Sequence, residues 1–318
     1  MSKVSSRNYP LWIGMVLTGF FVLIAIIGSR LAPQDPLEVF NELIRVGDTV
    51  YAPSRLPVPP LTLDQFLLGT DNAGRDLYSR LLWAIRPTLL LCFIIASLRI
   101  ILGTVLGLTG GWFGGPVTRV IDLLTDVSLA VPILLFALAL ISFIGNRELS
   151  TFMLALVATG WANTAVFVKN STLVIKQSPY IEGARAVGVR PFGILRGYVL
   201  PQLWPALPAL IAFELAAALL VIAELGFLGM FIGDAFIRMA EDPSSGGVIP
   251  VGLTSGFPEL GQMLSDFWSK MLLTPWEVAF IGVIIFLNIF AFNMLGEGLR
   301  RQMDVTRPRR RWRRRYSN

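Results

Sequence analysis

The chain has 318 residues, of which 54% are hydrophobic and only 15% are charged, with a formal net charge of +6. A soluble globular chain carries about 25% charged residues, so this composition excludes an ordinary soluble domain and indicates an integral membrane protein. The chain contains no histidine and one cysteine, Cys92. An intrachain disulfide is therefore excluded, and the commonest metal ligand and general base is missing. We expect no catalytic site and no metal site.

Six segments are long and apolar enough to cross a bilayer, whose hydrocarbon core of about 30 Å takes roughly 20 residues. They predict an all-α membrane protein with spans at 10–31, 88–108, 120–143, 151–168, 206–232 and 278–295. The first segment follows Lys3 and Arg7, as a signal peptide would. Its apolar run is longer than a signal core and ends without a small-residue cleavage site, so we expect a retained anchor.

The basic residues of the loops predict the orientation. Between the fourth and fifth spans five Lys or Arg residues accompany a single acid, Glu182, whereas acids outnumber bases between the fifth and sixth spans. Because cytoplasmic loops are enriched in Lys and Arg, the first loop is expected inside and the second outside. The arginine-rich tail, 297–318, then places both termini in the cytoplasm. We expect this tail to attract anionic lipid headgroups, and we expect no nucleic-acid partner, because no stacking aromatics accompany it.

The four predicted regions are 1–31, with the first span; 32–87, outside; 88–296, the membrane core with a cytoplasmic loop at 169–205; and the tail. The outer region is rich in proline, which excludes one long helix and favours short strands or turns around 44–53. From Thr70 or Asp71, either of which can cap a helix, an interfacial helix is expected to lead into the second span. The spacing of four predicts the ion pairs Asp71–Arg75 and Asp76–Arg80.

The cytoplasmic loop predicts a compact helix–glycine–helix unit. Residues 180–187 suit two helical turns, Gly188 suits a left-handed end, and Pro191 suits the start of a second helix that breaks at Leu200 and Pro201. Glu182 and Arg185 would present a charged face. Ala184, Val187 and Val189 would offer small apolar contacts to a groove on another protein.

Three ionisable residues fall inside the predicted spans, where an unpaired charge is costly: Arg99, Glu214 and Glu224. Each is expected to face protein or a cavity. Arg99 and Glu214 either pair within the helix bundle, which we favour, or one of them lines a path and meets a charged substrate.

The cytoplasmic loop resembles the EAA loop of ABC-importer permeases through Glu182, Gly183, Ala184, Arg185, Gly188, Leu200 and Pro201. The outer region resembles the LGTDxxGRDxxSR signature of C-type permeases of the dipeptide, oligopeptide and nickel group, through Gly69, Thr70, Asp71, Gly74, Arg75, Asp76, Ser79 and Arg80. The chain departs from the family pattern at Gly183, at Tyr198 and in its long outer segments, 32–68 and 234–272.

The resemblance implies the type I ABC-importer permease architecture, in the cell membrane, with about six transmembrane helices. It implies a second related permease, two ATPase subunits and an extracytoplasmic solute-binding protein as partners, and the ATPase subunits would bind ATP and Mg. The EAA-like residues would couple the chain to the ATPase. The outer signature would either rigidify the start of the second span or contact the second permease or the binding protein. We favour the contact, so that alanine at Arg75 or Asp76 would impair transport through lost subunit contacts rather than through unfolding. The implied cargo is di- or oligopeptides, with nickel chelates or oligosaccharides as alternatives.

No Gly-x-x-x-x-Gly-Lys-Ser/Thr pattern is present, so the chain has no recognisable phosphate-binding loop of its own. An ATP-independent secondary transporter remains as an alternative of a different class, although no inverted repeat is evident in the sequence. A membrane-embedded hydrolase is remote, because no Ser, Asp or Glu set converges within the spans.

Overall fold

The computed structural model describes residues 8–40, 42–46, 49–53, 57–146, 148–232, 236–241, 248–254 and 258–303. The first two bases, Lys3 and Arg7, and most of the arginine-rich tail lie outside these residues. The fold is mainly helical, as predicted. The helices are α1 Tyr9–Leu31, α2 Leu77–Phe113, α3 Gly115–Ala130, α4 Ile133–Ile144, α5 Leu149–Gly160, α6 Ala162–Lys176, α7 Pro179–Ala186, α8 Pro191–Ile194, α9 Leu200–Leu203, α10 Leu207–Phe227, α11 Leu260–Met263, α12 Phe267–Leu273 and α13 Pro275–Met303.

Hydropathy located all six predicted spans, but it did not predict that two of them are bent. Four described helices are long and apolar enough to cross a membrane, and two bent helix pairs raise the number to as many as six. The third and fourth spans are these pairs: α3 and α4 meet at 95°, and α5 and α6 meet at 40°. Pro132 lies in the first break and lacks the N–H that would continue a helix. The span predicted at 120–143 is therefore sharply bent between α3 and α4.

The second span is longer than predicted. It begins at Leu77 and continues to Phe113 as one helix of 37 residues, with Pro87 inside it. The interfacial helix expected to lead into the second span is continuous with it, and its residues form the first turns of α2. The helix starts at Asp76, whose side chain caps it, rather than at Thr70 or Asp71.

Close helix packing follows the glycines of α2. Gly103, Gly107 and Gly111 lie four residues apart, and a Cβ added at each would come within 2.6–2.7 Å of an atom of Trp161, Thr164, Ala165, Val168 or Thr172. Small residues at this spacing let two membrane helices approach closely. They explain why α6 packs along the C-terminal half of α2.

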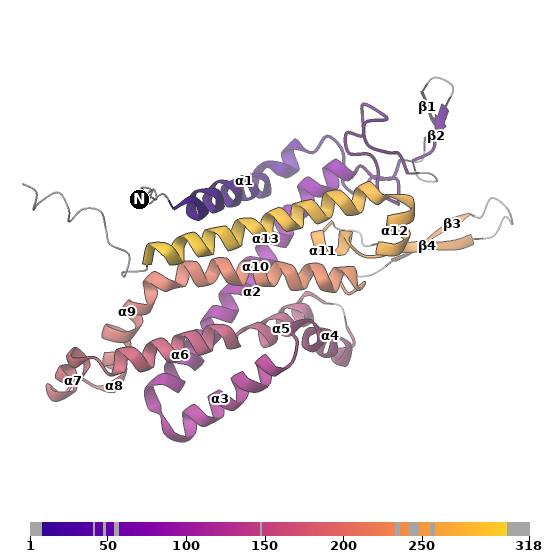
Figure 1. The fold of residues 1–318 in the computed structure, drawn as a ribbon. Helices are drawn as coiled ribbons and strands as arrows, with labels where there is room; N and C mark the ends of the chain where they lie inside the picture. Colours follow the sequence, from indigo (N-terminus) through magenta and orange to yellow (C-terminus); the bar gives the residue numbers. More distant parts are fainter. Residues whose placement is uncertain are drawn as a thin grey trace, which may run out of the picture.

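The two ends of the molecule differ (Figure 1). Two antiparallel hairpins project from one end, which we call the hairpin end: β1 Ile44–Val46 with β2 Thr49–Tyr51, as expected at 44–53, and β3 Phe236–Glu241 with β4 Val248–Thr254. The opposite end carries α7 and α8, and we call it the α7 end. The first described turn of α1 meets the end of α13 there, since the Asn8 side-chain amide donates to the Gly298 carbonyl at 2.7 Å.

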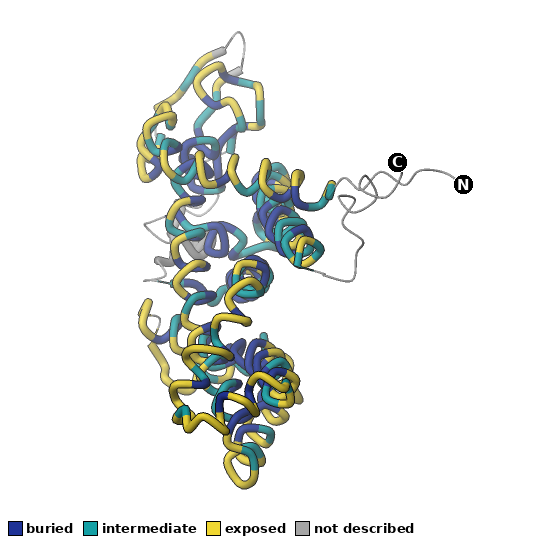
Figure 2. The backbone as a smooth tube through the Cα atoms, turned by 90° about the vertical axis from the view of Figure 1, so that its left-hand side faces the viewer, coloured by how far each residue is buried: buried dark blue, intermediate teal, exposed yellow. Residues whose placement is uncertain are grey.

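Many large apolar side chains remain exposed along the helices, including Val16, Leu90 and Phe286. Figure 2 shows these exposed stretches on the outer faces of the helices, with buried segments where the helices meet. Such a surface suits lipid, which is as apolar as these side chains. The chain is a multi-pass membrane protein.

Candidate functional site

The predicted outer signature folds into a turn that leads to α2. Gly69 and Gly74 have φ angles of +76° and +78°, in the left-handed region that favours glycine. A Cβ at Gly69 would lie 2.4 Å from the Val58 carbonyl oxygen, so only glycine fits there. Thr70 and Asp76 face each other in a single antiparallel bridge across the turn.

Asp71 is the centre of this turn and is buried. Its Oδ1 accepts hydrogen bonds from the backbone N–H groups of Ala73 and Arg75 at 2.8 and 2.9 Å. Its Oδ2 lies 2.8 Å from Arg75 Nε and 3.3 Å from Arg80 Nε. Burial alone raises the pKa of Asp71, but the two arginines and the N–H donors outweigh it, so the net pKa is lowered. The predicted Asp71–Arg75 pair is confirmed.

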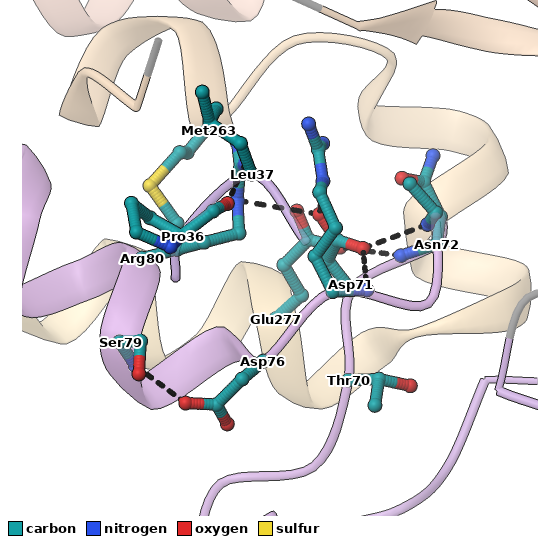
Figure 3. Close-up of polar contacts among 12 residues, drawn as sticks. Pro36, Leu37, Thr70, Asp71, Asn72, Asp76, Ser79, Arg80, Met263 and Glu277 are labelled. Carbon is teal, nitrogen blue, oxygen red and sulfur yellow. Dashed lines mark hydrogen bonds and ion pairs between the residues drawn. The ribbon is translucent and has the colours of Figure 1, made fainter. Parts of the chain in front are cut away.

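The predicted Asp76–Arg80 pair is wrong. Asp76 Oδ2 instead accepts the backbone N–H of Ser79 at 2.8 Å, as the N-cap of α2 (Figure 3). A cap must fold back over the first helical turn, and this geometry turns the carboxylate away from the side chain four residues later. Burial raises the pKa of Asp76.

Arg80 instead joins the signature to distant parts of the chain. Its Nη1 donates to the Pro36 carbonyl at 3.1 Å, and its Nη2 lies 3.5 Å from Gln262 Oε1. Two further bonds run from this turn to α13: the Asn72 N–H donates to Glu277 Oε2 at 3.3 Å, and Trp276 Nε1 donates to the Thr70 carbonyl at 3.0 Å. The turn is therefore tied both to the segment after α1 and to the α11–α13 region.

A second buried ion pair supports these contacts. Lys270 Nζ lies 2.8 Å from Glu277 Oε1 and donates to the Met263 carbonyl at 2.6 Å. Sequence reasoning missed Gln262, Lys270 and Glu277 as partners of the signature, because nearly 200 residues separate them from it. The buried signature contacts its own chain, and this favours the rigidifying alternative over a partner contact.

The predicted pair of Arg99 and Glu214 is confirmed in the middle of the helix bundle. Arg99 Nη1 lies 3.4 Å from Glu214 Oε2, and Arg99 Nε donates to the Leu156 carbonyl at 2.8 Å. Thr164 donates to the other carboxylate oxygen of Glu214 at 3.1 Å. Leu156 and Thr164 flank the break between α5 and α6, so this buried group joins α2 and α10 to the bend.

Glu224 lies apart from that pair, in the last turn of α10. It is partly buried and lines a hollow of about 410 Å³ with Leu134, Phe227 and Leu264. Of the three ionisable residues expected inside the spans, Arg99 and Glu214 pair with each other, and Glu224 lies apart from them.

At the opposite end, α7 has the predicted length and ending. Gly188 has a φ of +84°, and its N–H donates to the Arg185 carbonyl at 2.9 Å while the Val189 N–H donates to Ala184 at 3.0 Å. These bonds satisfy carbonyls that the helix end would otherwise leave free. We call Pro179–Ala186, the Gly188 turn and α8 together the α7 unit.

The apolar contacts of the α7 unit differ from the prediction. Ala184 is buried, and it packs with Ile181 in a cluster that includes Trp112, Ile175, Ile194, Val199 and Leu203. Val187 and Phe192 are 84% and 73% exposed and form the apolar outer surface. Val189 is only partly exposed. Glu182, Gly183 and Arg185 are exposed as expected.

Trp112, at the end of α2, holds the α7 unit to the membrane helices. Arg185 lies over its ring at 5.1 Å from the centroid, and Lys176 Nζ donates to its carbonyl at 2.6 Å. No role for Trp112 was predicted from the sequence. The cation–aromatic contact was not visible there, because Arg185 lies more than 70 residues away.

The predicted break at Leu200 and Pro201 does not occur. A five-residue π-helical stretch, Leu195–Val199, continues into α9, where Pro201 lies in the first turn. Pro201 has no N–H to donate to the preceding turn, and the π-helical stretch before it accommodates the proline without a break. The whole stretch Pro191–Phe227 counts as one long apolar helix.

The chain is similar to known transport proteins. Residues 99–304 match the family described as "Binding-protein-dependent transport system inner membrane component". A glutathione transport system permease protein from Pectobacterium atrosepticum is 31% identical over 74% of this chain and 71% of its own. A dipeptide transport system permease protein from Alkalihalophilus pseudofirmus is 28% identical over 95% of this chain and 88% of its own.

A solved structure supports the fold. A chain of the MetNI methionine ABC transporter, in inward-facing conformations, matches with a TM-score of 0.51 and 18% identity, over 70% of this chain and 96% of its own. The family match spans α7, the bend at α5 and α6 and most of the long helices. The chain therefore belongs to the family of inner membrane components of binding-protein-dependent transport systems.

Proposed function

We propose that the chain is a permease subunit of an ATP-driven ABC importer that moves di- or oligopeptides delivered by an extracytoplasmic binding protein. The observation that carries this proposal is the family match over 99–304, which includes both the helical core and the α7 unit. Relatives named for dipeptide transport in three organisms, each 28% identical over 94–95% of this chain, support the peptide cargo.

The α7 unit is the proposed contact with the ATPase. Glu182, Gly183, Ala184, Arg185 and Gly188 form or end α7, and Leu200 and Pro201 follow in the same helical hairpin. Exposed Val187 and Phe192 suit a shallow groove, and exposed Glu182 suits a cation at its rim. ATP and Mg would be held by the partner subunits, so this chain would perform no bond chemistry.

The proposed assembly contains a second related permease, two ATPase subunits and the binding protein. We infer that both termini face the cytoplasm, together with the α7 unit. The meeting of α1 and α13 at the α7 end supports this orientation. The hairpin end, with the signature residues, would then face the binding protein.

Nucleotide-driven closure of the ATPase subunits would move the α7 unit, and the Trp112–Arg185 contact would pass that movement to α2. Such alternation needs rigid elements between its two states. The signature residues would keep the hairpin end rigid, and the Arg99–Glu214 pair would fix the bend of α5 and α6. Glu224 is the intramembrane charge whose position on an open hollow best suits the transport path.

Peptide cargo is tested by competition. Proteoliposomes that contain the complete complex and its binding protein are given a labelled dipeptide with an excess of unlabelled tripeptide, nickel chelate or oligosaccharide. Competition by the tripeptide alone is expected. Competition by the chelate or the sugar alone would replace the peptide assignment while leaving the importer assignment in place.

A further inference from the structure

Helix α1 is held at both ends and leaves a gap in the middle. Near the hairpin end, a Cβ at Gly28 would lie 2.9 Å from the Leu82 carbonyl oxygen, so α1 touches α2 there. Near the α7 end, Gly14 and Gly298 bring α1 equally close to α13. Between these contacts α1 diverges from α2, and the space between them forms a groove.

The groove is apolar along most of its length and basic at one end. Its main part has a volume of about 460 Å³, and α1, α2, α10 and α13 all line it, with residues such as Val22, Ile26, Phe93 and Phe292. A smaller hollow of about 170 Å³ continues it beside the Gly28 contact, where Ser29, Trp83 and Arg86 lie. Arg86 and Leu90 line both parts, so the two hollows form one site.

Arg86 is exposed, and in the part of the chain that the structure describes it makes no hydrogen bond or ion pair. It lies in the part of α2 near the hairpin end, ten residues after the Asp76 cap. The long side chain of an arginine in this part of a span can extend its charged end to the level of the lipid headgroups, where a phosphate can pair with it. The site thus offers a charged group and a hydroxyl at the headgroup level and an apolar groove directly below them.

The volume of the groove indicates which kind of molecule can bind in it. An α-helix is about 10 Å across with a pitch of 5.4 Å, so a single turn with its side chains fills about 500 Å³. The main groove therefore holds less than one turn of a partner helix, and its volume of about 460 Å³ suits one fatty acyl chain. We propose that this groove binds an anionic phospholipid, with its phosphate at Arg86 and one acyl chain between α1 and α2.

The ligand is selected by its headgroup rather than by its chain. Acyl chains leave one apolar environment for another when they enter the groove, so the apolar part discriminates little between lipids. One basic residue near a membrane surface favours an anionic lipid by about five-fold. The bound chain fills the gap and couples α1 to α2. This site is independent of the transported substrate.

Native mass spectrometry of the delipidated complex tests the proposal, with phosphatidylglycerol or phosphatidylcholine added at equal mole fraction. The wild-type complex is expected to retain phosphatidylglycerol about five-fold better than phosphatidylcholine. Arg86→Gln should abolish this preference, and Arg86→Lys should keep it. Arg30→Gln removes an exposed arginine from the last turn of α1 that does not line the groove, and it should leave the preference unchanged.

A second variant tests the acyl groove separately. Ala25→Trp adds a large side chain to the lining of the groove, leaves Arg86 in the sequence and should lower the retention of both lipids. Equal retention of the two lipids by the wild type, the same preference in Arg86→Gln, or unchanged retention in Ala25→Trp would overturn the proposal. So would crosslinking of a photoreactive residue at Leu90 to another subunit instead of lipid. A complex that binds the lipid but imports no peptide would contradict only the proposed function.

Discussion

The carboxylate of Asp71 is expected to contribute strongly to the stability of the folded chain. It is buried between two arginines, and its replacement removes the carboxylate that lies against both guanidinium groups. Breaking a buried pair in this way costs about 3–5 kcal/mol. We therefore expect Asp71→Asn to lower the thermal unfolding temperature of the purified complex strongly. Asp64→Asn, at an exposed position of the same region, is the matched control and should have no effect.

The pH dependence of this effect has a definite sign. Because the pKa of Asp71 is lowered by folding, its stabilisation is fully present above the ordinary value of 3.8 and is lost as the pH falls through the lower value of the folded state. The difference in unfolding temperature between wild type and Asp71→Asn should thus be equal at pH 7 and pH 5 and shrink only below about pH 4. A difference that has already vanished at pH 5 would contradict this account.

Gly160 leaves the space that Arg99 needs. A Cβ at this position would lie 2.1 Å from Arg99 Cζ, so Gly160→Ala must displace the guanidinium from Leu156 and Glu214. Overpacking of this kind costs about 1–3 kcal/mol, and a lower unfolding temperature is expected. Gly282→Ala in α13 meets no atom within 4 Å and serves as the control. Equal unfolding temperatures for the two variants would show that the pair does not fix the bend.

At the scale of elements, the α7 unit depends on one backbone conformation. Valine at position 188 would have to adopt a φ of +84°, which strains a β-branched residue by about 1–3 kcal/mol. If transport requires the intact unit, Gly188→Val should lower peptide uptake about 5- to 150-fold, while the subunit content of the complex stays normal. The control is Gly197→Ala: residue 197 lies outside the α7 unit, a Cβ added there would meet no atom within 4 Å, and uptake should stay normal. Normal uptake in both variants would refute a coupling role for this turn.

The elements also show what the sequence could predict. Hydropathy found every span, because a span must be apolar over roughly 20 residues whatever its neighbours do. It missed the bends, because the break at α5 and α6 is stabilised by Arg99 from another helix. Local spacing predicted the Asp71–Arg75 pair, yet the pair forms in a turn rather than on a helix. The same rule failed for Asp76, where helix capping competes for the carboxylate.

The long-range partners of the candidate site were beyond prediction for the same reason. Gln262 and Glu277 reach the signature only through the packing of α11 and α13 beside the start of α2, and no local pattern records that packing. The α7 unit was better predicted, because its length, its glycine and its capping are local properties. The sequence did not predict which apolar residues of the unit face outward: Ala184 is buried and Phe192 is exposed.

For the whole molecule, α2 connects the proposed sites. At 37 residues it is about 55 Å long, with the Asp76 cap at one end, Arg99 near its middle and Trp112 under the α7 unit at the other. It is therefore one continuous helix between the hairpin end and the surface proposed to meet the ATPase. A displacement of the α7 unit would reach the opposite end through this helix rather than through loops.

The most direct test of the proposed function is to measure whether ATP or an ion gradient drives uptake. Proteoliposomes that contain the complete complex, with ATP inside and the binding protein outside, are measured for uptake of a labelled dipeptide while ionophores collapse the proton and sodium gradients. We expect accumulation above the external concentration only when ATP and the binding protein are both present, and none with this chain alone. Accumulation by the isolated chain that needs a proton or sodium gradient and no ATP would contradict the account and identify a secondary transporter.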